Sequence, residues 1–285
     1  MNVKRIILFI TISLLATNAG FAQQGYIQQG EFGFSAGIGH YFGDLNTRSA
    51  LNRPKPSLGV FFRKQFGEYV SMRVAGRFAQ LGYSDIYSKN EYQKLRNLSF
   101  NSNIFEFAVQ GDFNFYRYVP TDVNYNFTPY VTLGLGVFSY DPYAYDDDGV
   151  KQYLRPLHTE GQTMNIPGYE DRDKEYSTMA ICIPFGVGIK YSINPKVNLS
   201  FEVTHRFTTT DYLDDVSKTY VGVSNFGVDA NGLPTTAALL QDRSEGQSLG
   251  VAGRQRGWSK QKDQYVIAEV GLSFNLGSYR CPTAF

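Results

Sequence analysis

The chain has 285 residues, with 27 Lys and Arg against 26 Asp and Glu, and it is rich in Phe (22) and Tyr (21). A chain so close to neutral lacks the basic excess of a nucleic-acid-binding protein. After the first 22 residues it contains no run of 18 apolar residues, so a role inside a membrane would need strands rather than helices.

The N-terminus predicts a secretory signal peptide. Residues 1–5 (MNVKR) carry two positive charges, residues 6–16 are apolar, and Gly20 and Ala22 are the small residues of a cleavage site before Gln23. The apolar run is too short to span a bilayer as a helix. We therefore expect a signal peptide over residues 1–22 and one barrel domain over residues 23–285.

Eight segments of the remaining chain alternate apolar and polar residues, the pattern of β-strands. They cover residues 31–42, 57–66, 69–82, 104–117, 127–140, 177–191, 196–209 and 263–276. Short connections (67–68, 118–126, 192–195) alternate with long ones (43–56, 83–103, 141–176, 210–262). No helix is expected after the signal peptide.

The two faces of these strands differ in size as well as polarity. In the stretch NIFEFAVQGDFNFYRY (residues 103–118), Phe105, Phe107 and Phe113 alternate with Glu106 and Asp112. An eight-stranded barrel is only just wide enough for its own side chains, so the bulky face cannot be the inner one, as a soluble lipocalin-like barrel would require. The sequence predicts an all-β fold: an eight-stranded antiparallel up-and-down transmembrane barrel, apolar outside, with long extracellular loops and short periplasmic turns.

The polar face then lines the lumen. The strand register turns five cations and four carboxylates inward: Arg63, Arg73, Arg77, Lys190 and Arg206 with Glu106, Asp112, Glu202 and Glu269. Because isolated buried charges are costly, we expect a packed ion-pair network that plugs the tube. Lys64 should face lipid near the short-turn rim, beside an aromatic girdle of Phe66, Tyr69, Phe127 and Tyr191.

Four stretches resemble the PorG family, small outer-membrane barrels of Bacteroidota associated with the type IX secretion system. They are residues 31–45 (EFGFSAGIGHYFGDL), 159–162 (TEGQ), 183–191 (IPFGVGIKY) and 210–217 (TDYLDDVS). The motif residues carried over are Thr159, Glu160, Gly161, Gln162, Thr210, Asp211, Tyr212, Leu213, Asp214 and Asp215. The resemblance implies a non-enzymatic component of a protein-export machine, which ties a periplasmic ring of a lipoprotein and its partner to the outer membrane. It also implies a connection with gliding motility.

Candidate partner contacts lie in the short turns and the C-terminal tail. They include Asn124 and Tyr125 in the turn 119–126, the turn 192–195, and Tyr279, Cys281 and Pro282 in the tail. Cys182 should face the lumen about 20 Å or more from Cys281, too far for a disulfide between them. Cys281 could therefore form a disulfide with a ring subunit, the alternative being an inert thiol.

The sequence gives weak support for a metal site, a cofactor site or a catalytic site, and we expect none of them. Asp211, Asp214 and Asp215 do not match the spacing of an EF-hand loop, so they should cap turns and pair with neighbours such as Arg206. His205 should face outward near the long-loop rim, without a convincing nucleophile or orienting acid. The alternatives left open are a passive structural barrel, a small-solute or lipid transporter, and a lipid-modifying enzyme that uses His205.

Overall fold

The chain folds into a closed β-barrel, seen in a computed structural model that describes residues 30–172, 174–244 and 249–276. The predicted signal peptide, Tyr279, Cys281 and Pro282 lie outside the described residues. Eight strands form the wall: β1 (Glu31–Phe42), β2 (Lys55–Gln65), β3 (Val70–Ser84), β4 (Ser99–Asn114), β5 (Phe127–Ser139), β8 (Met179–Asn194), β9 (Val197–Thr208) and β10 (Gln264–Asn275).

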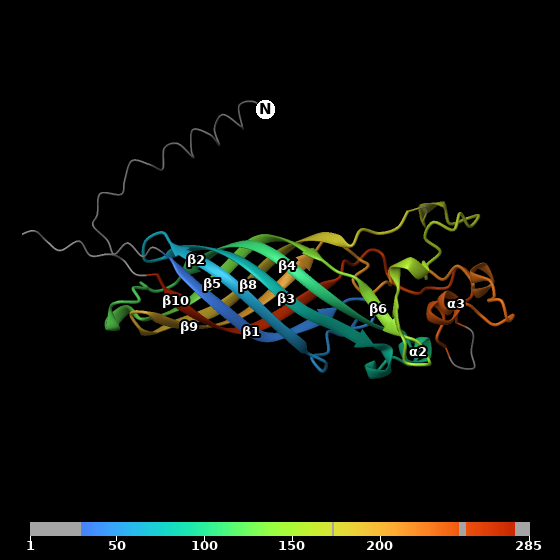
Figure 1. Cartoon of the computed structure of the whole chain (residues 1–285), viewed down its shortest axis with the longest axis horizontal. Coiled ribbons are helices and arrows are strands. Elements are labelled where there is room, and N and C mark those ends of the chain that lie inside the picture. The colour runs from blue at the N-terminus through green and yellow to red at the C-terminus, as the bar shows by residue number, and fades with distance from the viewer. Residues whose placement is uncertain (1–29, 173, 245–248, 277–285) are drawn as a thin grey trace, which may run out of the picture.

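Each wall strand pairs antiparallel with the next one along the chain (Figure 1). The tube closes where β1 meets β10, in a register that runs from Glu31 opposite Asn275 to Phe42 opposite Gln264. The predicted eight-stranded up-and-down barrel is therefore confirmed. The largest difference in the bounds is in β4, which begins at Ser99 rather than at 104, because it continues beyond the outward aromatic pattern.

The four long connections gather at one end of the barrel, which we call the long-loop end; the short turns lie at the opposite, short-turn end (Figure 1). The expectation of no helix after the signal peptide was wrong. The loops contain α2 (Glu91–Arg96), α3 (Thr236–Gln241), the 3₁₀ helices η2 (Asp85–Tyr87), η4 (Arg155–Leu157), η5 (Glu170–Arg172) and η6 (Val223–Phe226), and the hairpin of β6 (Pro142–Tyr145) and β7 (Lys151–Tyr153). A further 3₁₀ helix, η3 (Val123–Tyr125), lies in a short turn.

The helices were missed because six residues are too few to show a helical period. Local hydrogen bonds define α2 instead: the Asn90 side chain accepts from the backbone N–H of Tyr92, and Asn97 ends the helix in the left-handed conformation. In the part of the chain that is described, no helix is long and apolar enough to cross a membrane.

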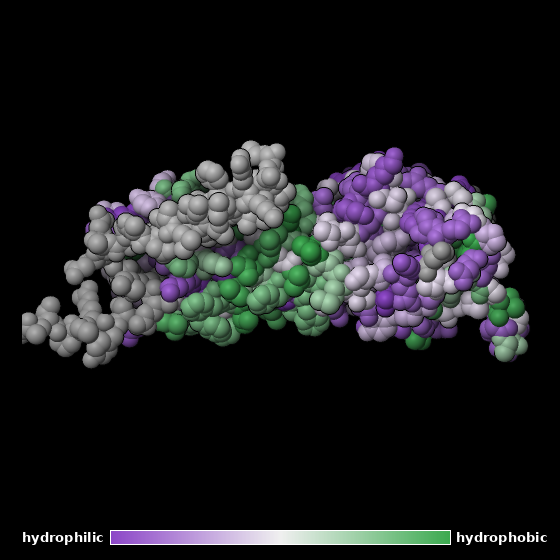
Figure 2. All heavy atoms as spheres, turned by 90° about the horizontal axis from the view of Figure 1, so that it is seen from above, coloured by the Kyte–Doolittle hydropathy of each residue, from purple (hydrophilic) through white to green (hydrophobic). Residues whose placement is uncertain are grey.

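The outer face of the barrel is apolar and its inner face is polar, as predicted. On β4, Phe105 and Phe107 are 60% and 55% exposed, whereas Glu106 and Gln110 between and beyond them are buried. Figure 2 shows the apolar surface over the barrel and a hydrophilic surface over the long-loop end. Exposed apolar surface on this scale marks contact with lipid or a partner. Lys64 and the girdle residues Phe66, Tyr69, Phe127 and Tyr191 are all exposed on the outside.

A hydrophobic cluster fills the barrel at the long-loop end. It includes the inward-facing side chains of Tyr41, Phe100, Phe138 and Tyr265, all at most 1% exposed. Tyr41 meets the edge of Phe100 with their ring centroids 4.7 Å apart, and Phe138 meets Tyr265 in the same way at 5.7 Å. We call these four residues the aromatic plug. They separate the polar lumen below from the loops above.

Candidate functional site

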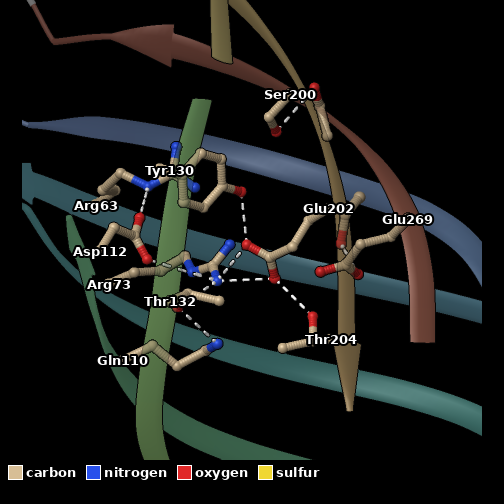
Figure 3. A network of polar contacts seen from close by, with 12 residues as sticks. Arg63, Arg73, Gln110, Asp112, Tyr130, Thr132, Ser200, Glu202, Thr204 and Glu269 are labelled. Atoms are coloured by element: carbon tan, nitrogen blue, oxygen red, sulfur yellow. Dashed lines mark hydrogen bonds and ion pairs between the residues drawn. The ribbon is translucent and has the colours of Figure 1, made fainter. Parts of the chain in front are cut away.

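The middle of the lumen holds the first part of an ion network, centred on Arg73 of β3 (Figure 3). The Arg73 guanidinium nitrogen Nη2 lies 2.7 and 2.9 Å from the two carboxylate oxygens of Glu202 on β9. Glu202 also accepts hydrogen bonds from the Tyr130 hydroxyl at 2.6 Å and the Thr204 hydroxyl at 2.9 Å. Hydrogen bonds to a charged group are stronger than those between neutral groups. Glu202 accepts them from Arg73 on β3, Tyr130 on β5 and Thr204 on its own strand, β9.

Arg77 carries the network toward the long-loop end. Its guanidinium lies 2.9 Å from Glu269 on β10 and 3.2 Å from Glu106 on β4. Glu106 is shared with Arg206, whose Nε lies 3.1 Å away, and it accepts a 2.7 Å hydrogen bond from Tyr265 of the aromatic plug. All seven residues predicted for this network (Arg73, Arg77, Glu106, Asp112, Glu202, Arg206 and Glu269) are buried and mutually connected.

The network also extends to the short-turn end, where sequence reasoning missed one member. Asp112 lies 2.9 Å from Nε of Arg63 and 3.0 Å from Nζ of Lys190. Arg63 also pairs with Glu31, the first residue of β1. With Glu31, five buried cations face five buried carboxylates, so the network carries no net charge.

Glycines make room for the aromatic rings of the lumen. Gly188 of β8 lies opposite Tyr130 of β5, and a Cβ at Gly188 would be 2.7 Å from the Tyr130 ring. In the same way a Cβ at Gly33 would be 2.5 Å from the Phe61 ring, which also points inward. The small inner residues predicted from sequence thus accommodate rings and ion pairs, and together these side chains fill the tube.

Two of the motifs that carry the family resemblance meet in the cap, by which we mean the long loops that cover the long-loop end of the barrel. The Thr159 hydroxyl donates to the carboxylate of Asp215. Glu160 accepts hydrogen bonds from the backbone N–H groups of Ser217 and Lys218 at 2.9 and 3.0 Å, and its carboxylate lies 3.2 Å from Arg256. The motif 159–162 is therefore joined to the end of the motif 210–217 by both side-chain and backbone bonds.

The remaining motif residues have structural reasons as well. Gly161 has φ +78°, and a Cβ there would lie 2.9 Å from Ile166 and Val221, so both conformation and space require glycine. Gln162 accepts from the Glu160 N–H at 3.1 Å. Tyr212 stacks on Tyr176 with a centroid separation of 4.6 Å, Leu213 is fully buried, and the Thr210 hydroxyl lies 2.7 Å from that of Tyr140.

The acids of the second motif do not pair with Arg206, contrary to the sequence-based expectation. Arg206 points into the lumen and pairs with Glu106, whereas Asp215 has Arg256 of the cap 3.9 Å away. Asp211 accepts from Ser217, and Asp214 from the N–H of Val216. The Tyr41 hydroxyl lies 2.5 Å from Asp214 and 2.9 Å from Asp263.

Burial dominates the electrostatics of these acids. Desolvation raises the pKa of Asp211 to about 7, with the charges of Asp44 and Glu160 adding to the effect. It also raises the pKa of Asp44 and of Asp215 to about 6, against the opposing influence of nearby arginines. Desolvation and repulsion from neighbouring acids, Asp44 among them, hold the pKa values of Asp214 and Asp263 well above the ordinary carboxyl range. Within the described residues no group of three or more His, Cys, Asp and Glu is arranged to hold a metal ion.

The other predicted candidates lie apart from these clusters. His205 faces outward between Phe42 and Phe207, and its Nε2 lies 2.7 Å from the Gln264 amide oxygen, so its described partners are an amide and rings. Asn124 and Tyr125 are exposed at the short-turn end. Cys182 is buried in the lumen wall, as predicted, 3.9 Å from Glu106.

Comparison with known proteins relates the chain to outer-membrane barrels and to one family. No curated protein matches it. Neisserial surface protein A is 10% identical with a TM-score of 0.42, over 88% of this chain and 100% of that one. A major outer membrane protein of Thermus thermophilus is 11% identical with a TM-score of 0.39, over 87% and 99%. The N-terminal barrel domain of Pseudomonas aeruginosa OprF is 10% identical with a TM-score of 0.36, over 87% and 100%. A family model matches residues 4–227, and the chain belongs to that family, described as "Domain of unknown function (DUF6089)".

Proposed function

We propose that the chain is a non-enzymatic outer-membrane component of the type IX secretion system, which anchors a periplasmic ring of lipoprotein and partner subunits. In this proposal the apolar face contacts lipid, the long loops are extracellular, and both termini are periplasmic. The secretion role rests on the resemblance to the PorG family described above. The membrane placement rests on the exposed apolar face.

The observation that carries an anchoring role is the filled lumen. Five cations and five carboxylates interlock across the tube, and the aromatic plug lies above them. A solute pathway would need a continuous opening lined by polar groups and water. With the interior committed to packing, binding surfaces must lie on the outside of the barrel, in the cap or in the short turns.

The short-turn end supplies the surface that would meet the ring. The turn 119–126 projects there, with Asn124 and Tyr125 exposed and the Arg117 guanidinium 4.5 Å from the Tyr125 ring centroid. Tyr and Arg are common at protein interfaces, because they give large contact area and several hydrogen bonds. The tail containing Cys281 is a further candidate, through a disulfide with a ring subunit.

Site-specific cross-linking tests the anchoring role and its polarity together. A photo-reactive amino acid is placed at position 124, and in a matched control at position 233, an exposed site in a long loop. Cross-linking in living cells should join position 124, but not position 233, to periplasmic subunits that co-purify in mild detergent. Deletion of the protein should reduce the export of secreted cargo.

Two outcomes would contradict the proposal. Normal cargo export in the deletion strain would favour a passive structural barrel. Cross-links to periplasmic proteins from position 233 alone would reverse the orientation. The Cys281 disulfide has its own test: a non-reducing gel should show a heavier band that disappears in a Cys281→Ser variant.

A further inference from the structure

A cavity of about 380 Å³ opens at the long-loop end of the barrel wall, beside Phe100 of the aromatic plug and apart from the ion network. Its walls come from the start of β2 and the residues before it, the end of β3, and the start of β4. They include Arg53, Lys55, Tyr83, Tyr87, Ser99 and Asn101. The volume lies near the lower end of the usual range for ligand cavities, about 300–1,000 Å³.

Two cations line this cavity without a carboxylate partner. Among the residues that the structure describes, neither Arg53 nor Lys55 has an acidic oxygen within ion-pair distance, although every cation of the lumen network does. The Arg53 guanidinium lies over the Tyr87 ring, 3.8 Å from its centroid. The half-buried Lys55 donates one hydrogen bond, of 2.5 Å, to the Asn101 amide oxygen. An ammonium has three donors, so Lys55 has further donors to offer.

The height of the cavity follows from the strand register. Leu58, Phe78 and Phe105 face outward and lie opposite one another on β2, β3 and β4, in one row of the apolar band. Lys55 and Asn101 lie three and four positions further along their strands, about 10–13 Å along a strand and about 8–10 Å of height for a tilted one, and Arg53 lies two positions before Lys55. The headgroup layer adds about 5–8 Å to each side of the hydrocarbon core. The two cations therefore lie at the outer edge of the headgroup layer or just beyond it.

We propose that this cavity binds a phosphate group, presented by a lipid headgroup of the leaflet at the long-loop end or taken up as free phosphate. Arg53 supplies a planar pair of donors that matches two phosphate oxygens, and Lys55 supplies a point charge. Tyr87 and Ser99, which both carry hydroxyl groups, are among the lining residues. The lipid source rests on the membrane placement proposed above, but neither source depends on a role in secretion.

Native mass spectrometry of the full chain extracted from defined vesicles tests this inference. The vesicles contain phosphatidylcholine with a small fraction of lipid A, or of lipid A from which the phosphates have been removed. A third sample is the chain in detergent with inorganic phosphate alone, followed by its thermal unfolding midpoint. Retention of lipid A, with weaker retention of the dephosphorylated form, identifies a lipid phosphate. A shift of the unfolding midpoint by inorganic phosphate identifies the free anion.

The variant that tests the cavity is Arg53→Gln with Lys55→Gln. At about 1 kcal/mol for each cation near an anionic headgroup layer, losing both should weaken phosphate-dependent retention about 30-fold. The matched control is Lys89→Gln with Lys260→Gln, which removes the same charge from exposed loop positions outside this cavity and should retain lipid A as the parent does. Arg53→Lys keeps the positive charge at this position. Comparing it with the cavity variant separates the loss of charge from any misfolding of the loop.

Three results would overturn the inference. The first is equal retention of lipid A and its dephosphorylated form, together with no effect of inorganic phosphate. The second is an equal loss of retention in the cavity variant and the control. The third is unchanged retention of lipid A in the cavity variant. That the variant is a folded barrel is checked by its resistance to denaturation in unheated detergent.

Discussion

The strongest test of the lumen structure is to remove one charge from its most connected pair. Glu202→Gln keeps the shape of the side chain but leaves Arg73, which is 2% exposed, with a single carboxylate in range, Asp112 at 3.8 Å. Breaking a buried ion pair by removing one partner costs about 3–5 kcal/mol, because an uncompensated charge stays in a low-dielectric site. With a urea dependence of about 1–3 kcal/mol/M, the unfolding midpoint should fall by at least about 1 M.

A double-mutant cycle separates the pair from its surroundings. Arg73→Met alone should be as harmful as Glu202→Gln, whereas the double variant restores neutrality and should cost clearly less than the sum of the two. The parent, the two single variants and the double variant are each unfolded by urea in lipid vesicles. The folded fraction is read from gels of unheated samples, on which the folded barrel migrates differently from the unfolded chain. Glu68→Gln is the matched control, because it breaks the exposed 2.7 Å pair with Arg117 and should leave the midpoint unchanged. Additive costs in the double variant would refute the view that the network is a unit.

Three further predictions follow from the cap and the plugged tube. In planar bilayers the protein should show no steady conductance, and regular open steps would contradict a filled lumen. The cap should open more readily as the pH rises from about 4 to about 7, because the pKa of the buried acid Asp211 is raised to about 7 and its protonated form favours the folded cap. Hydrogen exchange of the loops measures this, and Asp211→Asn should make the profile shallower, with the remaining slope due to Asp44 and Asp215. Glu160→Gln should weaken the link to Ser217 and Lys218 and expose the loop 209–263 to proteases, while the barrel itself stays intact.

The barrel and its ion network could be predicted from the sequence because one rule governs both. A period of two assigns every residue of a strand to a face, and the narrow tube decides which face is inside. Glu106 and Asp112 therefore point inward together, as the structure shows. Glu31 was left out of the predicted network, although the same alternation places it on the inner face at the first position of β1.

The aromatic plug was only partly predictable in this way. The period of two places Tyr41, Phe138 and Tyr265 on the inner face, although these rings resemble the outward ones in composition, whereas Phe100 lies before the predicted start of β4. The contact between the motifs 159–162 and 210–217 was also beyond sequence reasoning. The contact is made partly by the backbone N–H groups of Ser217 and Lys218. Almost every residue has such a group, so the residue types at these positions do not indicate the contact.

The two ends of the lumen are closed by different chemistry, and this difference bears on how the barrel works. In the short-turn half, ion pairs join side chains of different strands, and their strength depends on distance and orientation. They therefore hold the wall strands in fixed positions relative to one another. Rings at the long-loop end hold by packing, and Tyr265 joins both parts through its hydrogen bond to Glu106. Under the proposed anchoring role, a load applied at the short turns would pass through this filled, neutral interior to the cap. A conducting tube would need the same space to be open.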